Sequence, residues 1–286
     1  MERDLHKRHG PVTDMFPRLE EPAPWRLSDD QVAAFERDGF VSGIKVFDEA
    51  QVAALCDRLE RLRTQVGELG DDLYEVEAAW TEDPDSVVFH FLGAWMVDEL
   101  FHDLVWHPAI TVPSAQLLGV ERLRFWHDQV FYKPPRHSGV VPWHQDYSYW
   151  TRTGPPRHIT VNVVLDDTNL ENGCLHFVPG SHRWPLLPKV PFDGPMDALL
   201  ADVPDELRDG FRPVPVPLRA GEASIHHSHT VHGSFANQSD GPRRAVVVNT
   251  MAADTRVAHG SAPLLKGVPM EPEGSVVAGD HFPILI

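Results

Sequence analysis

The sequence is poor in cysteine, in basic residues and in long apolar runs. Two cysteines among 286 residues are too few for a disulfide framework, and they predict reduced thiols in a cytoplasmic protein. Acidic residues outnumber lysine and arginine by 42 to 25, and the net charge of −17 disfavours binding to nucleic acid. No apolar run reaches the roughly 18 residues of a membrane span, and residues 1–6 lack the apolar core of a signal peptide. We therefore expect neither a nucleic-acid partner nor a membrane partner.

Two helical patterns lie near the start of the chain. Ser28 and Gln31 have the spacing of a capping box, which predicts a helix through about Glu36 that is closed by Gly39. Asp48 is the predicted cap of a second helix. Apolar residues recur in it at intervals of three and four: Val52, Leu55, Leu59 and Leu62. We expect these residues to lie in the core. The acidic segment 70–85 is predicted to be a loop, and the mostly apolar segment 86–119 to be helical around 95–101 and 110–118.

From residue 121 the pattern changes to the alternation that is typical of strands. His127 and Gln129 fall on one face of the first predicted strand, and Trp126 falls on the other. Further strands are predicted over 140–147, 158–165, 173–178, 222–231 and 243–252. Several strands separated by turns, without alternating helices, indicate an antiparallel sandwich or barrel.

We expect a single domain over residues 1–286. It begins with an N-terminal arm and helices over 1–120. The β core follows over 121–252, with a proline-rich insertion over 185–220 that is either a lid or a surface excursion. Residues 253–286 form the C-terminal tail.

Histidine is abundant, and one histidine stands two residues before a carboxylate. His144 and Asp146 lie in the predicted strand 140–147, where residues two apart share a face. Two histidines and one carboxylate on one side of an ion form the facial triad of non-haem Fe(II) oxygenases. The His-x-Asp pair alone is a weak signal, because so short a match often arises by chance.

Four histidines compete to be the third ligand: His226, His227, His229 and His232. A strand near a barrel mouth tolerates half-buried histidines, so several of them are expected to be structural. The last one is favoured, because Gly233 lets the backbone approach closely and Ser234 offers a hydroxyl. Arg243 follows in the next strand, and an arginine fork beside a serine can bind both oxygens of a carboxylate. Arg244 is expected to be a surface residue or a salt-bridge partner.

With these residues in view, the chain resembles the phytanoyl-CoA dioxygenase family of Fe(II)- and 2-oxoglutarate-dependent oxygenases. The resemblance extends from about residue 28 to 282. The matching stretches are His144-Gln145-Asp146, 170–175, 178–182, His232-Gly233-Ser234 and 237–244, together with Phe35, 38–41 and 279–280. In this order they are much more specific than the His-x-Asp pair alone.

The resemblance implies a mainly β fold with flanking helices around a double-stranded β-helix, the cupin-like jelly roll. It implies that iron is held by His144, Asp146 and His232. It further implies that 2-oxoglutarate is bound by a set of pocket residues: Arg243, Ser234, Gln129 and Asn162. The family often has other residues at the last two of these positions.

The implied activity is hydroxylation of an unactivated C–H bond of a small molecule, with Fe(II), 2-oxoglutarate and O2 and with release of succinate and CO2. Asp146 favours oxidation over halogenation, because related halogenases have a small residue there. Desaturation, epoxidation and ring formation remain open, as do a non-catalytic jelly-roll protein that binds the same ligands and a zinc hydrolase. The residues predicted to contact the substrate are Trp126, Tyr147, Tyr149, Trp150 and Arg183. We expect a monomer or a homodimer.

Overall fold

The computed structural model describes residues 4–69, 73–74 and 88–286. Its centre is a six-stranded sheet whose neighbouring strands all run antiparallel. In spatial order the strands are β1 (Phe40–Lys45), β9 (Glu222–His227), β6 (His158–Val164), β11 (Arg243–Ala252), β3 (Leu123–Lys133) and β2 (Phe89–Phe91). The N-terminal third of the chain thus supplies one strand at each edge of this sheet.

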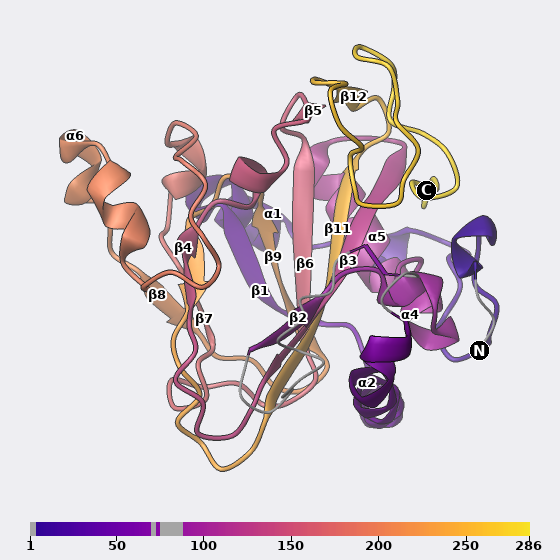
Figure 1. Cartoon of the computed structure of the whole chain (residues 1–286), viewed down its shortest axis with the longest axis horizontal. Helices are drawn as coiled ribbons and strands as arrows, with labels where there is room; N and C mark the ends of the chain where they lie inside the picture. The colour runs from indigo at the N-terminus through magenta and orange to yellow at the C-terminus, as the bar shows by residue number, and fades with distance from the viewer. Residues whose placement is uncertain (1–3, 70–72, 75–87) are drawn as a thin grey trace.

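A smaller antiparallel sheet has four strands. In order they are β4 (Val141–His144), β10 (His232–Ser234), β7 (Leu175–Phe177) and β8 (Val214–Val216). The two sheets stand apart in Figure 1, joined by long connections and not by a closed hydrogen-bonded barrel among the described residues. Two facing antiparallel sheets are the predicted cupin-like architecture, which is confirmed. A two-stranded ribbon is added by β5 (Thr153–Gly154) and β12 (Arg256–Val257).

The helices lie mainly before β3. The α-helices are α1 (Asp29–Asp38), α2 (Glu49–Leu69), α4 (Glu99–Leu104), α5 (Pro108–Leu118) and α6 (Asp205–Arg208). Short 3-10 helices are η1 (Leu5–Lys7), η2 (Ala23–Trp25), η3 (Ala94–Met96), η4 (Asp146–Tyr149), η5 (Ser181–Arg183) and η6 (Ala198–Asp202). No helix in the described part of the chain is both long and apolar enough to span a bilayer.

The predicted capping signals are confirmed. The side chain of Ser28 accepts a hydrogen bond from the backbone N–H of Gln31, and the side chain of Gln31 accepts one from the backbone N–H of Ser28. Helix α1 therefore begins with a complete capping box. Gly39 ends the helix at φ +85°, a left-handed conformation that favours glycine. The predicted loop over 70–85 lies almost wholly outside the described residues. The helices predicted around 95–101 and 110–118 correspond to η3 with α4 and to α5, and the same apolar segment 86–119 also contains the strand β2, because Phe89–Phe91 pairs with β3.

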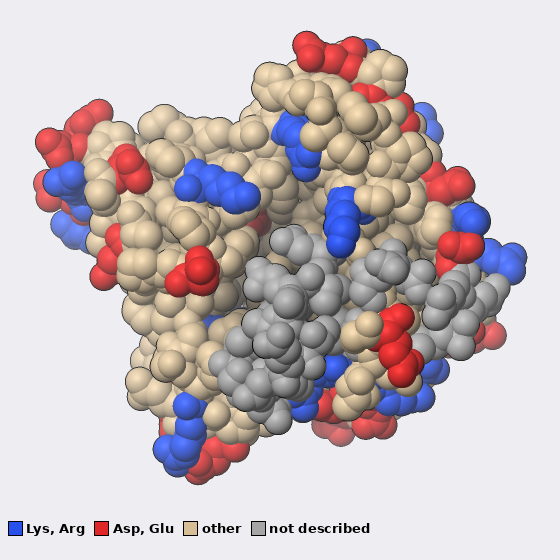
Figure 2. All heavy atoms as spheres, in the orientation of Figure 1, with Lys and Arg blue, Asp and Glu red and all other residues tan. Residues whose placement is uncertain are grey.

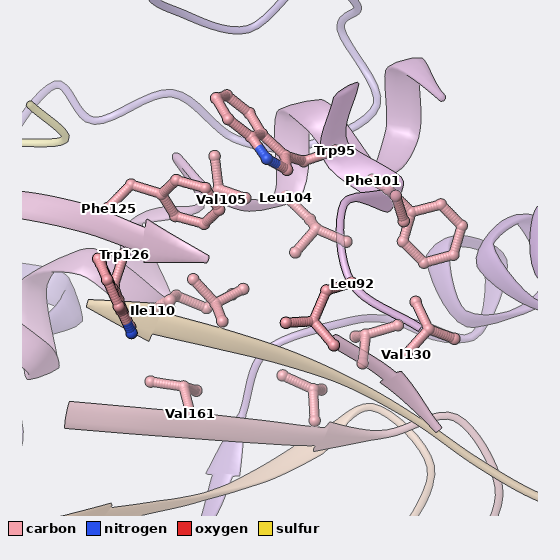
Figure 3. Packing of buried hydrophobic residues seen from close by; sticks show 14 of the residues in the cluster. Leu92, Trp95, Phe101, Leu104, Val105, Ile110, Phe125, Trp126, Val130 and Val161 are labelled. Atoms are coloured by element: carbon pink, nitrogen blue, oxygen red, sulfur yellow. The ribbon is translucent and has the colours of Figure 1, made fainter. Parts of the chain in front are cut away.

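The main core lies between the large sheet and the helices. Alternate residues of β6, Ile159, Val161 and Val163, face this core and are fully buried. Figure 3 shows the same layer, with Trp95 and Phe101 of the helical segments near the strands. Burial of one large apolar side chain contributes about 1.5–3 kcal/mol, so this layer fixes the large sheet firmly. The opposite face of β6 is thereby left for polar residues.

The predicted insertion over 185–220 forms a second, smaller core on the outer face of the small sheet. Leu187, Val190 and Leu199 pack there against Trp143 of β4 and Val231. The insertion also contains β8, which pairs with β7. The segment that follows η5 is therefore anchored to the sheet that carries β4 and β10.

Candidate metal and co-substrate site

His144 and His232 are direct partners across the β4–β10 pair. Side chains opposite each other on neighbouring strands share a face, and the centres of these two rings are 4.2 Å apart. Each Nδ1 lies within hydrogen-bonding distance of a carbonyl oxygen two residues earlier, at 2.8 Å from Pro142 and 2.9 Å from Thr230. With Nδ1–H donating to the carbonyl, each Nε2 lone pair is directed toward the interior.

Asp146 completes this cluster. Its Oδ1 lies 3.4 Å from His144 Nε2 and 3.7 Å from His232 Nε2, and the ligand atoms of the three buried residues are all within 4.8 Å of one another. The prediction of one strand over 140–147 is wrong, because β4 ends at His144 and Asp146 begins η4. The Asp146 carboxylate is therefore brought close to His144 by a 3-10 turn, and not because the two residues share one face of a strand.

The second oxygen of Asp146 is already occupied by hydrogen bonds. Oδ2 accepts from Thr160 Oγ1 at 2.6 Å and lies 3.0 Å from His226 Nε2, which donates to it. Only Oδ1 is left facing the two ligand-like histidines. Sequence reasoning treated His226 as structural, and only the pairing of β9 with β6, which sets it opposite Thr160, brings it here.

The protonation states of this cluster suit a divalent metal. Burial by itself would raise the pKa of Asp146, but His232, His144 and His226 outweigh it and hold this pKa well below its ordinary value. Burial lowers the pKa of His232 well below its ordinary value. Asp146 is thus a carboxylate and His232 a neutral imidazole, the forms in which these side chains bind metal.

Arg243 is a buried cation without a partner among the described residues. It is 2% exposed, and its Nε and Nη2 have no hydrogen-bond partner. Burial lowers the pKa of its guanidinium to about 10, so the group stays charged at neutral pH. Ser234 Oγ and Asn162 Nδ2, which line the same pocket, are also buried and have no hydrogen-bond partner in the part of the chain that the structure describes. An unpaired buried charge is costly, so this set of donors fits a bound carboxylate.

The neighbouring residues behave differently. Arg244 forms two hydrogen bonds with Asp166, at 2.7 and 3.0 Å from its two oxygens, as predicted for a salt-bridge partner. Lys133, the cross-strand partner of Arg243, is fully buried and donates to the carbonyls of Ser234 and Phe235. Its pKa is lowered well below the usual value by burial and then by Arg243. No pattern in the sequence predicts a role for Lys133.

One pocket of about 380 Å³ contains both the metal cluster around Asp146 and the unpaired donors around Arg243. Gln129 lines it and accepts a hydrogen bond from His90 at 2.8 Å. Trp126 also lines it, although the period-two pattern predicts the opposite face. The reason is a register shift between β3 and β11, where Asn249 pairs with His127 but Thr250 pairs with Phe125, and Trp126 is the extra residue.

The predicted substrate residues divide into two groups. Trp126, Tyr149 and Trp150 line the pocket, and their contact with a substrate stays a prediction. Tyr147 and Arg183 do not belong to its described lining. Tyr147 donates its hydroxyl to the Thr153 carbonyl, and Arg183 donates to backbone carbonyls at the end of α1, so both side chains have structural partners.

The donor set matches the cofactors of a non-haem iron oxygenase. Two imidazoles and one monodentate carboxylate on one side of a position suit Fe(II) and leave room for further ligands. The unpaired Arg243 and Ser234 suit the distal carboxylate of a dicarboxylic acid such as 2-oxoglutarate.

Comparisons with known proteins agree with this chemistry. The family profile described as Phytanoyl-CoA dioxygenase (PhyH) matches residues 35–245. Ectoine dioxygenase of Bordetella parapertussis is 30% identical over 247 residues, which cover 79% of this chain and 76% of that protein.

Two solved structures extend the likeness to the fold. The epimerase SnoN, in complex with Fe3+, alpha ketoglutarate and nogalamycin RO, has a TM-score of 0.71 and 25% identity, covering 93% of this chain and 100% of that one. The non-heme alpha ketoglutarate dependent carbocyclase SnoK from nogalamycin biosynthesis has a TM-score of 0.66 and 26% identity, covering 90% and 96%. Alpha ketoglutarate is another name for 2-oxoglutarate.

Proposed function

Since the chain belongs to the phytanoyl-CoA dioxygenase family, we propose that it hydroxylates an unactivated C–H bond of a small molecule and releases succinate and CO2. The protein is an oxidoreductase that depends on Fe(II), 2-oxoglutarate and O2. The proposal depends most on one observation: a buried His-Asp-His cluster shares a pocket with a buried arginine whose Nε and Nη2 have no partner among the described residues.

We assign the iron to His144 Nε2, Asp146 Oδ1 and His232 Nε2. The carbonyl contacts at both Nδ1 atoms support this assignment, because they fix the tautomer that leaves Nε2 free. The hydrogen bonds at Asp146 Oδ2 support monodentate binding through Oδ1. When bound, Fe(II) and 2-oxoglutarate would activate dioxygen, which is the oxidant: two of its four oxidising equivalents convert 2-oxoglutarate to succinate and CO2, and the other two oxidise the C–H bond.

We assign the distal carboxylate of 2-oxoglutarate to Arg243 and Ser234. The guanidinium can donate through Nε and Nη2, and the serine hydroxyl can donate a third hydrogen bond. In this arrangement, Asn162 and Gln129 form part of the pocket wall between the carboxylate clamp and the iron. Trp150 and the other aromatic side chains of the pocket exclude water from the reacting atoms.

The same residues and cofactors can serve another outcome. Epimerisation and ring formation are the reactions named for the solved structures SnoN and SnoK. Mass spectrometry of the product separates the possibilities: hydroxylation adds one oxygen atom, ring formation or desaturation removes two hydrogens, and epimerisation leaves the mass unchanged.

The cofactor assignment is tested without a known substrate. Anaerobic addition of Fe(II) and then 2-oxoglutarate should give a weak visible charge-transfer band, and air should give slow uncoupled succinate release. His232→Ala should abolish both signals. The matched control His229→Ala changes a histidine of the same run that lies outside the metal cluster and should retain them. A colourless complex that turns over a substrate with zinc alone contradicts the proposal.

A further inference from the structure

The described residues at the mouth of the site pocket are basic, although the protein as a whole is strongly acidic. Arg152, Lys189 and Lys266 all line the pocket. Among its described lining residues the one carboxylate is Asp146, which belongs to the metal cluster. Figure 2 shows basic side chains around the hollow in this face, while acidic side chains lie mostly toward the outline of the molecule. With a net charge of −17, such a local excess of positive charge runs against the composition.

The three cations come from separate segments and are held in different ways. Arg152 follows η4 and donates to the carbonyls of Pro263 and Leu264, which fixes it against the C-terminal tail. Lys189 comes from the segment after η5, and its Nζ lies 4.9 Å from the centre of the Tyr149 ring. Lys266 is exposed and follows Leu264 and Leu265 along the pocket wall. Their convergence is a property of the fold and not of any sequence motif.

Inside the mouth the wall is aromatic. His90 stacks between Phe131 and Phe192, with ring centres 4.5 and 5.5 Å away. Tyr149 lies 5.0 Å from Phe192, measured between ring centres. These flat surfaces suit an apolar or ring-bearing body. The proposed 2-oxoglutarate takes the depth of the 380 Å³ pocket beside Arg243, so a substrate must extend outward past the aromatic wall toward the cations.

We propose that the substrate is an organic acid. Its apolar body lies against the aromatic wall, and its carboxylate or phosphate lies at the mouth between Arg152, Lys189 and Lys266. The inference rests on the proposed function, because it assumes that 2-oxoglutarate occupies the depth of the pocket. A single exposed cation contributes little to the binding of an anion. We therefore expect each lysine to favour the acid over its neutral amide by about two- to fivefold. Arg152, which is held in place, contributes more.

The test compares probes that share one skeleton and differ in charge. Naphthoic acid and naphthyl phosphate are the anionic probes, and naphthamide is the neutral one. Binding to the protein loaded anaerobically with Fe(II) and 2-oxoglutarate is measured by calorimetry, so no turnover is needed. The matched variants are Lys189→Met with Lys266→Met at the mouth, and Lys7→Met with Lys45→Met at exposed lysines outside the pocket.

We expect an anionic probe to bind at least about tenfold more tightly than the amide. The mouth variant should reduce this preference to about threefold or less, while the control variant retains it. The preferred anion, carboxylate or phosphate, identifies the headgroup. An acid that binds no better than the amide, including the case in which neither binds, overturns the proposal.

Two further outcomes are distinguishable. If the mouth variant weakens 2-oxoglutarate binding and leaves the preference for acid unchanged, the cations guide the co-substrate inward, and the inference is wrong. If no charge-transfer band forms with 2-oxoglutarate, the proposed oxygenase function fails instead. The preference for acid over amide is then measured on the metal-free protein. A preference there still supports a site for an acid at the mouth, and no preference excludes it.

Discussion

His226 Nε2 lies 3.0 Å from Asp146 Oδ2, whereas Oδ1 of the same carboxylate lies 3.4 Å from His144 Nε2 and 3.7 Å from His232 Nε2. The contact arises in one row of the large sheet. Thr160 of β6 is the cross-strand partner of both His226 and Asn249, and Thr160 also contacts Asp146 Oδ2. Thr160 and His226 in this row therefore both hydrogen-bond to Oδ2 of the carboxylate and leave Oδ1 for a metal.

We first predict that His226→Leu weakens Fe(II) binding by about 10- to 100-fold, because partners of metal ligands typically contribute that much to metal affinity. His226→Gln should recover part of the loss, since its amide can donate to the same oxygen. Fe(II) titration followed by the charge-transfer band measures both. His227→Leu, at the next position of the run, is the control and should bind Fe(II) as the unmodified protein does. Equal affinity in His226→Leu would show that Oδ2 needs no partner.

The second prediction concerns the carboxylate clamp. Arg243→Ala should raise the 2-oxoglutarate requirement by roughly thirtyfold or more, which corresponds to about 2–5 kcal/mol for a lost buried charge pair. The requirement for substrate should change much less. The control Arg244→Ala breaks the pair with Asp166, which is partly exposed, and should cost about 1 kcal/mol of stability without affecting 2-oxoglutarate. If only the substrate requirement changes in Arg243→Ala, this arginine anchors the substrate instead.

A third prediction follows from the buried Lys133. Its Nζ lies 3.2 Å from the Ser234 carbonyl and also donates to the Phe235 carbonyl, so it supports the strand end that carries the serine hydroxyl. Lys133→Met fills the same space but removes the amine donor from both carbonyls, which should cost about 1–3 kcal/mol of stability. It should also raise the 2-oxoglutarate requirement while Fe(II) affinity is retained. Urea unfolding and titration of the charge-transfer band measure the two effects separately. An unchanged 2-oxoglutarate requirement would limit Lys133 to a role in stability.

The fourth prediction concerns pH. Burial raises the pKa of Asp128 to about 7, although its carboxylate accepts the backbone N–H groups of Gly93 and Trp95. Between about pH 4 and 7 the folded protein therefore holds a proton that the unfolded chain has released. The contribution of Asp128 to stability should therefore decrease as pH rises through this window, by up to about 1.4 kcal/mol per pH unit, while buried histidines such as His232, whose pKa is lowered, contribute in the opposite direction.

Asp128→Asn does not titrate, so the slope of its stability against pH should be more positive than that of the unmodified protein by the amount that Asp128 contributes. Urea unfolding of the metal-free protein at about pH 5 and pH 7 compares the two proteins. Parallel slopes in the two proteins would assign the pH dependence to other groups.

The sequence by itself determined the local features. Capping at Ser28, the apolar stripe of α2 and the strands β3, β6 and β11 follow from side-chain spacing, because helix and strand periods are local properties. The motif around His232 and the position of Arg243 were likewise visible, because these residues stand close together along the chain.

Tertiary structure alone decided which distant residues meet. It selected His226 from a run of four histidines by the register of β9 on β6, and it set His144 opposite His232 across β4 and β10. It also gathered Arg152, Lys189 and Lys266 at one mouth. Strand pairing and loop packing depend on long-range burial and not on neighbouring residues, so no spacing rule along the chain could have predicted these contacts.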